Sequence, residues 1–247
     1  MKNILITGSN GFIGRNLADA IHNYDPNINI LGYDIHSSHD DLKNYCSVAD
    51  FIFNLAGVMR PKDEKEFMEG NCGVLRQVLE ETVSANNYCP VMLSSSIQAS
   101  RDGGYAQSKR AAEDLLFADA AVTGRKAVVF RFTNLFGRYK RPNTDSVVAT
   151  FCYNIARNMP IKVNDPSAEI TFCYIDDVCT ELIKTLNGNE SYVGRYADVN
   201  PKYTIKIGDL AALIRYIASN LDSILNDDFE YKIRSTYISY LPVNYKE

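Results

Sequence analysis

Tyr105 and Lys109 lie four residues apart in the segment Tyr-Ala-Gln-Ser-Lys, and no other tyrosine of the chain has a lysine at that spacing. Because residues i and i+4 share one face of a helix, the phenol and the ammonium can meet above one ligand. A neighbouring ammonium stabilises a phenolate, so Tyr105 can act as a general acid or base toward a carbonyl or alcohol oxygen. Lys109 would also anchor a nicotinamide ribose.

Three consecutive serines, Ser94, Ser95 and Ser96, follow the apolar run 90–93. Ligands of open α/β sheets bind beyond the carboxyl ends of the strands, so the position of these serines favours a role in binding. We predict that Ser96 hydrogen-bonds the reacting oxygen, that Ser94 contacts a cofactor and that Ser95 contacts a substrate. The predicted catalytic set is Ser96, Tyr105 and Lys109.

A glycine-rich segment, 7–14, follows the first apolar run and precedes a helical pattern. Its spacing is G-x-x-G-x-x-G. Glycines allow a tight turn and a close approach of the backbone to a pyrophosphate, and a helix N-terminus attracts the anion. The predicted cofactor contacts in this segment are Gly8, Asn10, Gly11, Phe12, Ile13 and Gly14.

Asp34 stands 20 residues after Gly14, at the end of the second predicted strand. A carboxylate in this position can accept hydrogen bonds from the adenosine ribose and would repel a 2′-phosphate. No arginine or lysine follows it before Lys43. On charge alone, Asp34 favours NAD over NADP.

The elements that must position these groups alternate between short apolar runs and helical patterns, which predicts βαβ crossovers and a parallel sheet. Predicted strands are 3–7, 28–33, 51–55, 90–93 and 127–132, and predicted helices are 13–23, 64–86, 105–122 and 207–219. We therefore predict an α/β fold: a Rossmann-type doubly wound parallel sheet with a small C-terminal substrate-binding lobe. The dinucleotide-binding domain is expected at 1–137, and 138–247 is expected to form mainly the lobe.

The composition limits the partners and the location of the protein. The 247 residues carry a net charge of −4, which argues against nucleic acid as a partner. No apolar run is long enough for a signal peptide or a membrane span, so we expect a cytoplasmic protein that does not bind membranes. The six cysteines form no Cys-x-x-Cys pair, and we expect them to be reduced thiols. The three histidines show no metal-ligand spacing, so no metal is expected.

Six motifs in order resemble the hallmarks of extended short-chain dehydrogenases/reductases of the NAD-dependent epimerase/dehydratase type. They are TGSNGFIG at 7–14, NLAG at 54–57, SSS at 94–96, YAQSK at 105–109, RFTNLFG at 131–137 and YIDDV at 174–178. Within that family, the segments 54–71, 93–100 and 146–153 resemble the reductase domain of bacterial capsular-polysaccharide UDP-2-acetamido-2,6-dideoxy-hexos-4-ulose reductases. Those relatives continue past the Tyr-Leu-Pro at 240–242 into a cupin-like domain, where this chain ends.

The resemblance implies further site residues. Leu55, Ala56 and Gly57 would line the cofactor, and Asn71 would steady the structure near the site. The substrate contacts that it suggests, together with Ser95, are Arg60, Asn134, Arg138 and Lys140. One departure is that Ile170, Thr171 and Phe172 stand where many extended enzymes have Arg-Asp-Phe, so another cation must bind the nucleotide diphosphate.

The implied function is NAD(P)H-dependent reduction of the 4-keto group of a UDP-linked deoxy-amino sugar, a step in surface-polysaccharide precursor synthesis. The alternatives are an NAD-dependent nucleotide-sugar 4-epimerase and a non-catalytic dinucleotide-binding regulatory protein. A 4,6-dehydratase is disfavoured because Ile97 and Gln98, which follow Ser96, cannot transfer protons. The resemblance favours NADPH, whereas Asp34 favours NAD, so the cofactor choice stays open. The family also implies a homodimer that pairs through the helices at 64–86 and 105–122.

Overall fold

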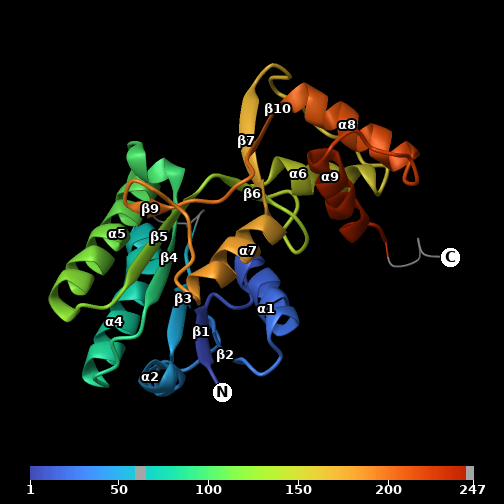
Figure 1. The fold of residues 1–247 in the computed structure, drawn as a ribbon. Coiled ribbons are helices and arrows are strands. Elements are labelled where there is room, and N and C mark those ends of the chain that lie inside the picture. The colour runs from blue at the N-terminus through green and yellow to red at the C-terminus, as the bar shows by residue number, and fades with distance from the viewer. Residues whose placement is uncertain (59–64, 243–247) are drawn as a thin grey trace. The chain divides into compact units, whose positions relative to one another are not determined.

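The chain divides into two units, and the computed structural model describes residues 1–58 and 65–242 (Figure 1). The first unit consists of Met1–Phe132 and Cys179–Asp198. The second consists of Thr133–Val178 and the chain from Val199 onward. The chain therefore leaves the first unit after residue 132 and returns to it for twenty residues. The expected lobe at 138–247 is a functional assignment and stays a prediction.

The sheet of the first unit grows outward from β1, whose Ile4, Leu5 and Ile6 are fully buried. Its order is β2-β1-β3-β4-β5-β9-β8, in which β2 to β5 and β9 pair in parallel and β8 is antiparallel. The bounds are β1 Asn3–Thr7, β2 Asn29–Tyr33, β3 Phe51–Asn54, β4 Val91–Ser96, β5 Ala127–Phe132, β8 Tyr192–Val193 and β9 Tyr196–Ala197. The order reverses between β1 and β3, and this switch point is where doubly wound sheets bind ligands.

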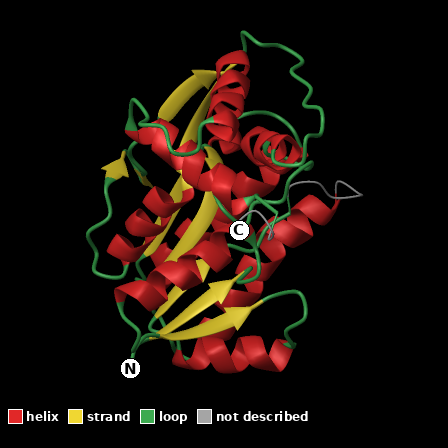
Figure 2. Cartoon of the chain, turned by 90° about the vertical axis from the view of Figure 1, so that its right-hand side faces the viewer, coloured by secondary structure: helices red, strands yellow, loops and turns green. Residues whose placement is uncertain are grey.

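Helices of the first unit connect these strands and cover the sheet on two faces, as Figures 1 and 2 show. The bounds are α1 Phe12–Tyr24, α2 His39–Val48, α3 Lys65–Met68, the π-helix η1 Glu69–Gly73, α4 Val74–Ser84, the 3₁₀-helix η2 Ile97–Ser100 and α5 Gly104–Thr123. Helices α4 and α5 lie on one face and α1 on the other (Figure 1). The predicted Rossmann-type doubly wound sheet is thereby confirmed.

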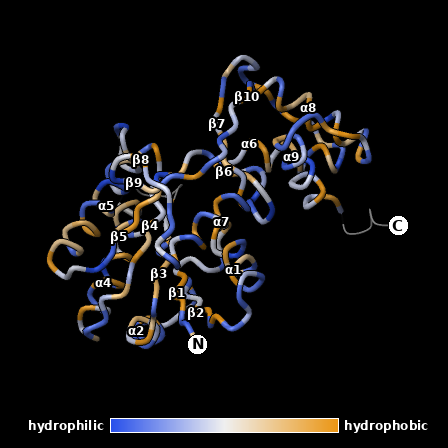
Figure 3. Tube along the Cα trace, in the orientation of Figure 1, coloured by the Kyte–Doolittle hydropathy of each residue, from blue (hydrophilic) through white to orange (hydrophobic). Residues whose placement is uncertain are grey.

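One apolar core joins the sheet to α2, α4 and α5. It contains Leu5, Ile52, Leu93 and Val129 from four strands, and Leu75, Val78, Ala112 and Leu116 from the helices. Figure 3 shows how hydrophobic residues run along β1. This core fixes α5 against β4 and β5, and α5 carries the Tyr-x-x-x-Lys pair.

The second unit contains a small sheet of order β10-β7-β6, in which β6 is parallel and β10 antiparallel to β7. The bounds are β6 Asn134–Phe136, α6 Val147–Ile155, β7 Glu169–Tyr174, α7 Ile175–Thr185, β10 Tyr203–Lys206, α8 Ile207–Ser219 and α9 Asp228–Ser239. Helix α7 starts in this unit and continues into the first. No helix of the described residues is long and apolar enough to cross a membrane.

Before β4, the observed helices differ from the expected ones in two places. The helix expected at 64–86 is interrupted, because its described part is α3, then the π-helix η1, then α4. Helix α2 was not expected, since its polar residues give little helical periodicity. A capping box starts it: the Ser38 hydroxyl accepts from the Asp41 N–H, and the Asp41 carboxylate accepts from the Ser38 N–H.

Candidate functional site

The structure brings Tyr105 and Lys109 together at the start of α5. Lys109 is only 6% exposed and its Nζ donates to the Ser94 carbonyl over 3.0 Å. The same Nζ lies 5.8 Å from the centre of the Tyr105 ring. Burial lowers the pKa of Lys109 to about 8, and the charge of Glu113 opposes that shift. A buried ammonium beside a phenol is the arrangement that a proton-transferring tyrosine needs.

The three serines at the end of β4 do not act as one group. Ser94 offers its carbonyl to Lys109, and the Ser96 hydroxyl accepts from the Gln98 N–H over 3.2 Å and so caps η2. The Ser95 hydroxyl donates to the buried carboxylate of Glu113 instead. Side chains alternate along a strand, so Ser95 points to the opposite face from its two neighbours. The structure does not bring Ser95 together with the catalytic candidates, and we leave it out of the proposed substrate contacts.

The glycine-rich loop closes tightly between β1 and α1. Gly8 has a φ of +69°, its N–H donates to the Tyr33 carbonyl over 2.8 Å, and the Gly11 N–H donates to the Gly8 carbonyl over 2.9 Å. A Cβ on Gly14 would lie 2.3 Å from the Gly8 oxygen, so only glycine fits there. Gly11 is the N-cap of α1 and has no side chain to cap the first turn. The loop leaves the helix start open to an anion, as a dinucleotide pyrophosphate requires.

Asp34 lies beside this loop. Its Oδ2 accepts from the Asn10 N–H over 2.7 Å, and its Oδ1 accepts from the Ile35 N–H over 2.8 Å. Each carboxylate oxygen has two lone pairs, so both can accept a further hydrogen bond. The carboxylate is therefore placed next to predicted cofactor contacts, and its choice between NAD and NADP stays a prediction.

The segment Leu55 to Gly57 packs on the same loop. The Leu55 N–H donates to the Thr7 carbonyl and the Ala56 N–H to the Thr7 hydroxyl, each over 3.2 Å. A Cβ on Gly8 would lie 2.9 Å from the Ala56 nitrogen. The predicted contacts from the ends of β1 and β3 thus gather at one place, the carboxyl edge of the sheet.

Asn71 links this edge to α5. Its Oδ1 accepts from the Val58 N–H and its Nδ2 donates to the Val58 carbonyl, both over 3.0 Å, and Nδ2 also lies 3.1 Å from the Ser108 hydroxyl. A Cβ on Gly57 would lie 2.7 Å from Asn71 Oδ1 and 3.2 Å from Lys109 Nζ. Asn71 belongs to the π-helix η1, a type of helical turn that is frequent at functional sites. The expected steadying role of Asn71 fits these contacts.

Sequence reasoning missed two contacts at this edge. The Thr7 hydroxyl donates to Asn54 Oδ1 over 3.0 Å, and Asn54 is fully buried. Phe67 of α3 packs edge-on against the Tyr105 ring, with the ring centres 5.7 Å apart. Asn54 opens the NLAG motif and could have been named, whereas nothing in the sequence links Phe67 to Tyr105.

The predicted substrate contacts Asn134, Arg138 and Lys140 belong to the second unit, and Arg60 lies outside the described residues. Asn134 Nδ2 donates to the Thr171 carbonyl over 3.1 Å. Arg138 lies 3.5 Å from Asp176, with its side chain 36% exposed. Their contact with a substrate stays a prediction.

Lys140 is committed to Asp145, because its Nζ lies 2.7 Å from the Asp145 carboxylate. Burial acts to raise the pKa of Asp145, but the hydrogen bond and charge of Lys140 outweigh it, so that pKa lies below its ordinary value. Next to it, Tyr139 adopts a φ of +68°, which is rare for a residue with a side chain and often marks a functional loop. The Tyr240 hydroxyl donates to the Lys140 carbonyl and holds this loop.

These observations fit a dinucleotide cofactor. The tight turn that brings the loop to the start of α1 needs glycine at position 14, because a Cβ there would collide with the Gly8 oxygen, and the chemistry of Lys109 and Tyr105 suits a nicotinamide partner. Among the described residues, no group of three or more histidine, cysteine or acidic side chains could hold a metal ion.

Comparison with known proteins gives consistent results. A family model described as the NAD dependent epimerase/dehydratase family matches residues 4–196. The UDP-2-acetamido-2,6-beta-L-arabino-hexul-4-ose reductase of Pseudomonas aeruginosa is 38% identical over 243 residues, which is 97% of this chain and 65% of that protein. The match thus leaves about a third of that relative without a counterpart here.

Two solved structures show the same fold. The capsular polysaccharide assembling protein CapF of Staphylococcus aureus has a TM-score of 0.87 at 34% identity, covering 97% of this chain and 65% of its own. The UDP-glucuronic acid 4-epimerase of Bacillus cereus, in complex with NAD, has a TM-score of 0.80 at 17% identity, covering 96% of this chain and 98% of its own. The second likeness concerns the fold alone.

Proposed function

This chain belongs to the NAD dependent epimerase/dehydratase family, and on that premise we propose that it uses NAD(P)H to reduce the 4-keto group of a UDP-linked deoxy-amino sugar. The observation that carries the proposal is the buried Lys109, held by the Ser94 carbonyl beside the Tyr105 ring. The likeness to the P. aeruginosa reductase supports the substrate class.

In this proposal the bound dinucleotide supplies the hydride that reaches the carbonyl carbon. Tyr105 donates its hydroxyl proton to the carbonyl oxygen, which becomes the alcohol. The Lys109 ammonium stabilises the phenolate that Tyr105 leaves behind. The Ser96 hydroxyl hydrogen-bonds the same oxygen and orients it. Each of the three residues has one task, and together they account for the proton that reduction consumes.

The proposed binding residues divide into those for the cofactor and those for the substrate. The start of α1 would hold the pyrophosphate, since the N–H groups of Gly8, Asn10 and Gly11 already donate within the protein. The residues Leu55, Ala56 and Gly57 would line the cofactor. Ile170, Thr171 and Phe172 stand where many extended enzymes have Arg-Asp-Phe, so another cation must bind the substrate diphosphate. Arg138 is our candidate for that cation. Lys140 supports the proposal less, because its ammonium already pairs with Asp145.

A nucleotide-sugar 4-epimerase is the second candidate, since the same Ser96, Tyr105 and Lys109 would serve it. The two functions differ in how they treat the dinucleotide. An epimerase returns the hydride to its own substrate and retains NAD through purification. A reductase consumes one reduced dinucleotide for each sugar.

The test follows the absorbance of free NADH or NADPH with a UDP-4-keto-6-deoxy sugar as substrate. We expect oxidation of the dinucleotide in a 1:1 ratio with formation of the alcohol. Tightly retained NAD, together with interconversion of UDP-sugars without net oxidation of free dinucleotide, would support the epimerase and reject the reductase.

We also propose a cytoplasmic homodimer. All six cysteines are free, as a reducing compartment allows. For the dimer, α5 carries an apolar stripe at helical spacing, in which Ala111 and Leu115 are half-buried against the core, Ala118 is exposed and Val122 is 88% exposed. Two-fold pairing of this face with α4 beside it would cover the stripe. Light scattering at micromolar concentration tests this, and a monomeric mass would reject the dimer.

A further inference from the structure

Glu113 is a buried anion that the proposed mechanism does not use. It lies on α5, four residues after Lys109 and eight after Tyr105, and it is 2% exposed. An isolated buried carboxylate is costly, so its surroundings must compensate the charge. The way in which they do so ties Glu113 to the catalytic candidates.

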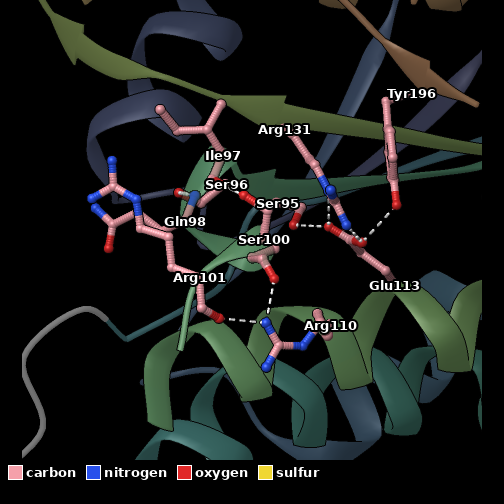
Figure 4. A network of polar contacts seen from close by, with 11 residues as sticks. Ser95, Ser96, Ile97, Gln98, Ser100, Arg101, Arg110, Glu113, Arg131 and Tyr196 are labelled. Atoms are coloured by element: carbon pink, nitrogen blue, oxygen red, sulfur yellow. Dashed lines mark hydrogen bonds and ion pairs between the residues drawn. The ribbon is translucent and has the colours of Figure 1, made fainter. Parts of the chain in front are cut away.

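The Glu113 carboxylate accepts four hydrogen bonds (Figure 4). Oε1 accepts from the Ser95 hydroxyl and from Arg131 Nε, the latter over 2.9 Å. Oε2 accepts from the Arg131 terminal nitrogen over 2.6 Å and from the Tyr196 hydroxyl over 3.2 Å. Four donors fill the four lone-pair positions of a carboxylate, so the network is fully satisfied.

The strand register explains why Glu113 reaches two strands at once. Ser95 of β4 and Arg131 of β5 are paired residues in the parallel ladder, so their side chains stand next to each other on the face that α5 covers. Glu113 binds both. Ser95, which lies between Ser94 and Ser96, therefore fastens the end of β4 to α5.

A second contact holds the segment that follows Ser96. Arg110, also on α5, donates from one terminal nitrogen to the carbonyls of Ala99 and Arg101, each over 2.5 Å (Figure 4). Ser96 is thus flanked on both sides by residues that bond to α5. Because Tyr105 and Lys109 stand on the same helix, these bonds set the distance between Ser96 and the pair.

We propose that Glu113 is a positioning residue for this reaction: through Ser95 and Arg131 it holds the end of β4, which carries Ser96, against the helix that carries Tyr105 and Lys109. The inference rests on the proposed function of those three residues.

The charge of Glu113 gives a readout that a merely structural role would not change. Burial lowers the pKa of Lys109 to about 8, and Glu113 is the carboxylate that acts against this. The other groups that the structure places next to Lys109 are Tyr105 on its own helix, the Ser94 carbonyl of β4 and the neutral Asn71 of η1. Removing the Glu113 charge should lower the pKa of Lys109 further. Activity that needs the ammonium should then be lost at a lower pH.

The experiment compares Glu113→Gln and Ser95→Ala with Asp114→Asn. Asp114 is the adjacent, exposed carboxylate, so the control removes the same charge from a residue that makes none of the four hydrogen bonds and reaches Arg131 by its charge alone. We expect Glu113→Gln to lower kcat about 10- to 100-fold, the size of effect that a small misplacement of reacting groups produces. The KM for the dinucleotide should stay within about twofold, and the alkaline limb of kcat/KM should move to lower pH. Ser95→Ala should lower kcat without moving that limb, and Asp114→Asn should resemble the wild type.

Two results would overturn the inference while leaving the proposed function intact. In the first, the wild type is active and Ser95→Ala leaves kcat unchanged. In the second, Glu113→Gln folds and keeps the kcat and the pH profile of the wild type. If Glu113→Gln fails to fold, Ser95→Ala carries the test of positioning. If the wild type turns over no keto-sugar, the proposed function fails instead. In that case the influence of Glu113 is tested without substrate, by following the titration of Lys109 through the ¹³C NMR signal of its ε-carbon. An equal midpoint in wild type and Glu113→Gln would reject the influence of Glu113 on Lys109.

Discussion

In the described residues, both units contain a charged side chain that is bonded to three partners, and the two charges have opposite signs. In the first unit the centre is an anion, Glu113, and its partners are Ser95, Arg131 and Tyr196. In the second unit the centre is a cation, Lys232, and its partners are Asp177, Asp228 and Tyr203. Burial acts to lower the pKa of Lys232, but hydrogen bonds to these partners outweigh it and raise that pKa above its ordinary value.

The two networks differ in what they hold. Glu113 lies within the helix that carries Tyr105 and Lys109, so its network joins α5 to the ends of β4 and β5. Lys232 stands on α9 and binds the start of α7 and β10, so its network closes the C-terminal helix onto its unit. It is also more open to solvent, since the Asp228 side chain is 66% exposed. We infer that the anion serves the reaction and the cation serves the stability of its unit.

The sharpest test of the chemical side of this comparison is Tyr105→Phe. The substitution removes only the hydroxyl that would transfer the proton, while the ring keeps its packing against Phe67. Turnover should fall about 10²- to 10⁴-fold, as is typical when a general acid is lost. Dinucleotide affinity, measured by fluorescence titration, should stay close to that of the wild type. A variant that turns over at the wild-type rate would remove Tyr105 from the mechanism.

Gly14→Ala should separate cofactor binding from chemistry in the same unit. The added Cβ would lie 2.3 Å from the Gly8 oxygen and 2.8 Å from Ser9, so the loop must open. We expect dinucleotide affinity to fall by about 100-fold, since the loop's backbone contacts with the pyrophosphate would be lost. Gly73→Ala is the matched control, because nothing lies within 4 Å of a Cβ there. Equal affinities of Gly14→Ala and the control would mean that the loop serves another ligand.

The parts that could be predicted from the sequence are those in which local pattern and tertiary packing agree. Strands β1 and β5 and helix α8 begin and end at the predicted residues. Their apolar residues are continuous in the buried strands and recur at 3.6-residue spacing in the helix, so burial and pattern coincide. The Tyr105 and Lys109 pair was also predictable, because both residues lie on one short helical segment.

The remaining features depend on contacts between distant segments. Glu113 shares the helix face of Lys109, but its proposed role depends on hydrogen bonds from Arg131 and Tyr196, which are 18 and 83 residues away along the chain. The different direction of Ser95 was accessible in principle, since strand alternation separates it from Ser94 and Ser96. It was missed because the strand was expected to end at Leu93, whereas β4 continues to Ser96.

Lys232→Met tests the second half of the comparison. The Lys232 side chain is 14% exposed and the substitution leaves the Asp177 and Asp228 carboxylates without their shared cation. We expect the free energy of unfolding to fall by about 1–3 kcal/mol, the usual cost of losing charged hydrogen bonds. Urea denaturation measures it, and Lys162→Met, an exposed site in the same unit, is the control. If kcat of the folded variant fell as far as in Glu113→Gln, the assignment of stability to one network and reaction to the other would be wrong.

The smallest expected effect concerns Asp34, a third charged centre, whose carboxylate bonds only to the backbone N–H groups of Asn10 and Ile35 among the contacts that the structure describes. Unlike Glu113, it has lone pairs left for a ligand. Asp34 should therefore accept hydrogen bonds from the ribose hydroxyls of NADH and repel the 2′-phosphate of NADPH. At ~4 Å and an effective dielectric of ~20, one like-charge pair costs on the order of 4 kcal/mol before relaxation and salt. A third of that cost is about tenfold in affinity.

The measurement is the dissociation constant of each reduced dinucleotide for the wild type and for Asp34→Asn. Asparagine keeps the size of the side chain and removes the charge, so NADPH should bind about tenfold more tightly to the variant while NADH changes little. The preference should also weaken with added salt, because the interaction is between charges near solvent. If the wild type already binds NADPH more tightly and Asp34→Asn makes no difference, then Asp34 holds only the loop, and the cofactor is NADPH.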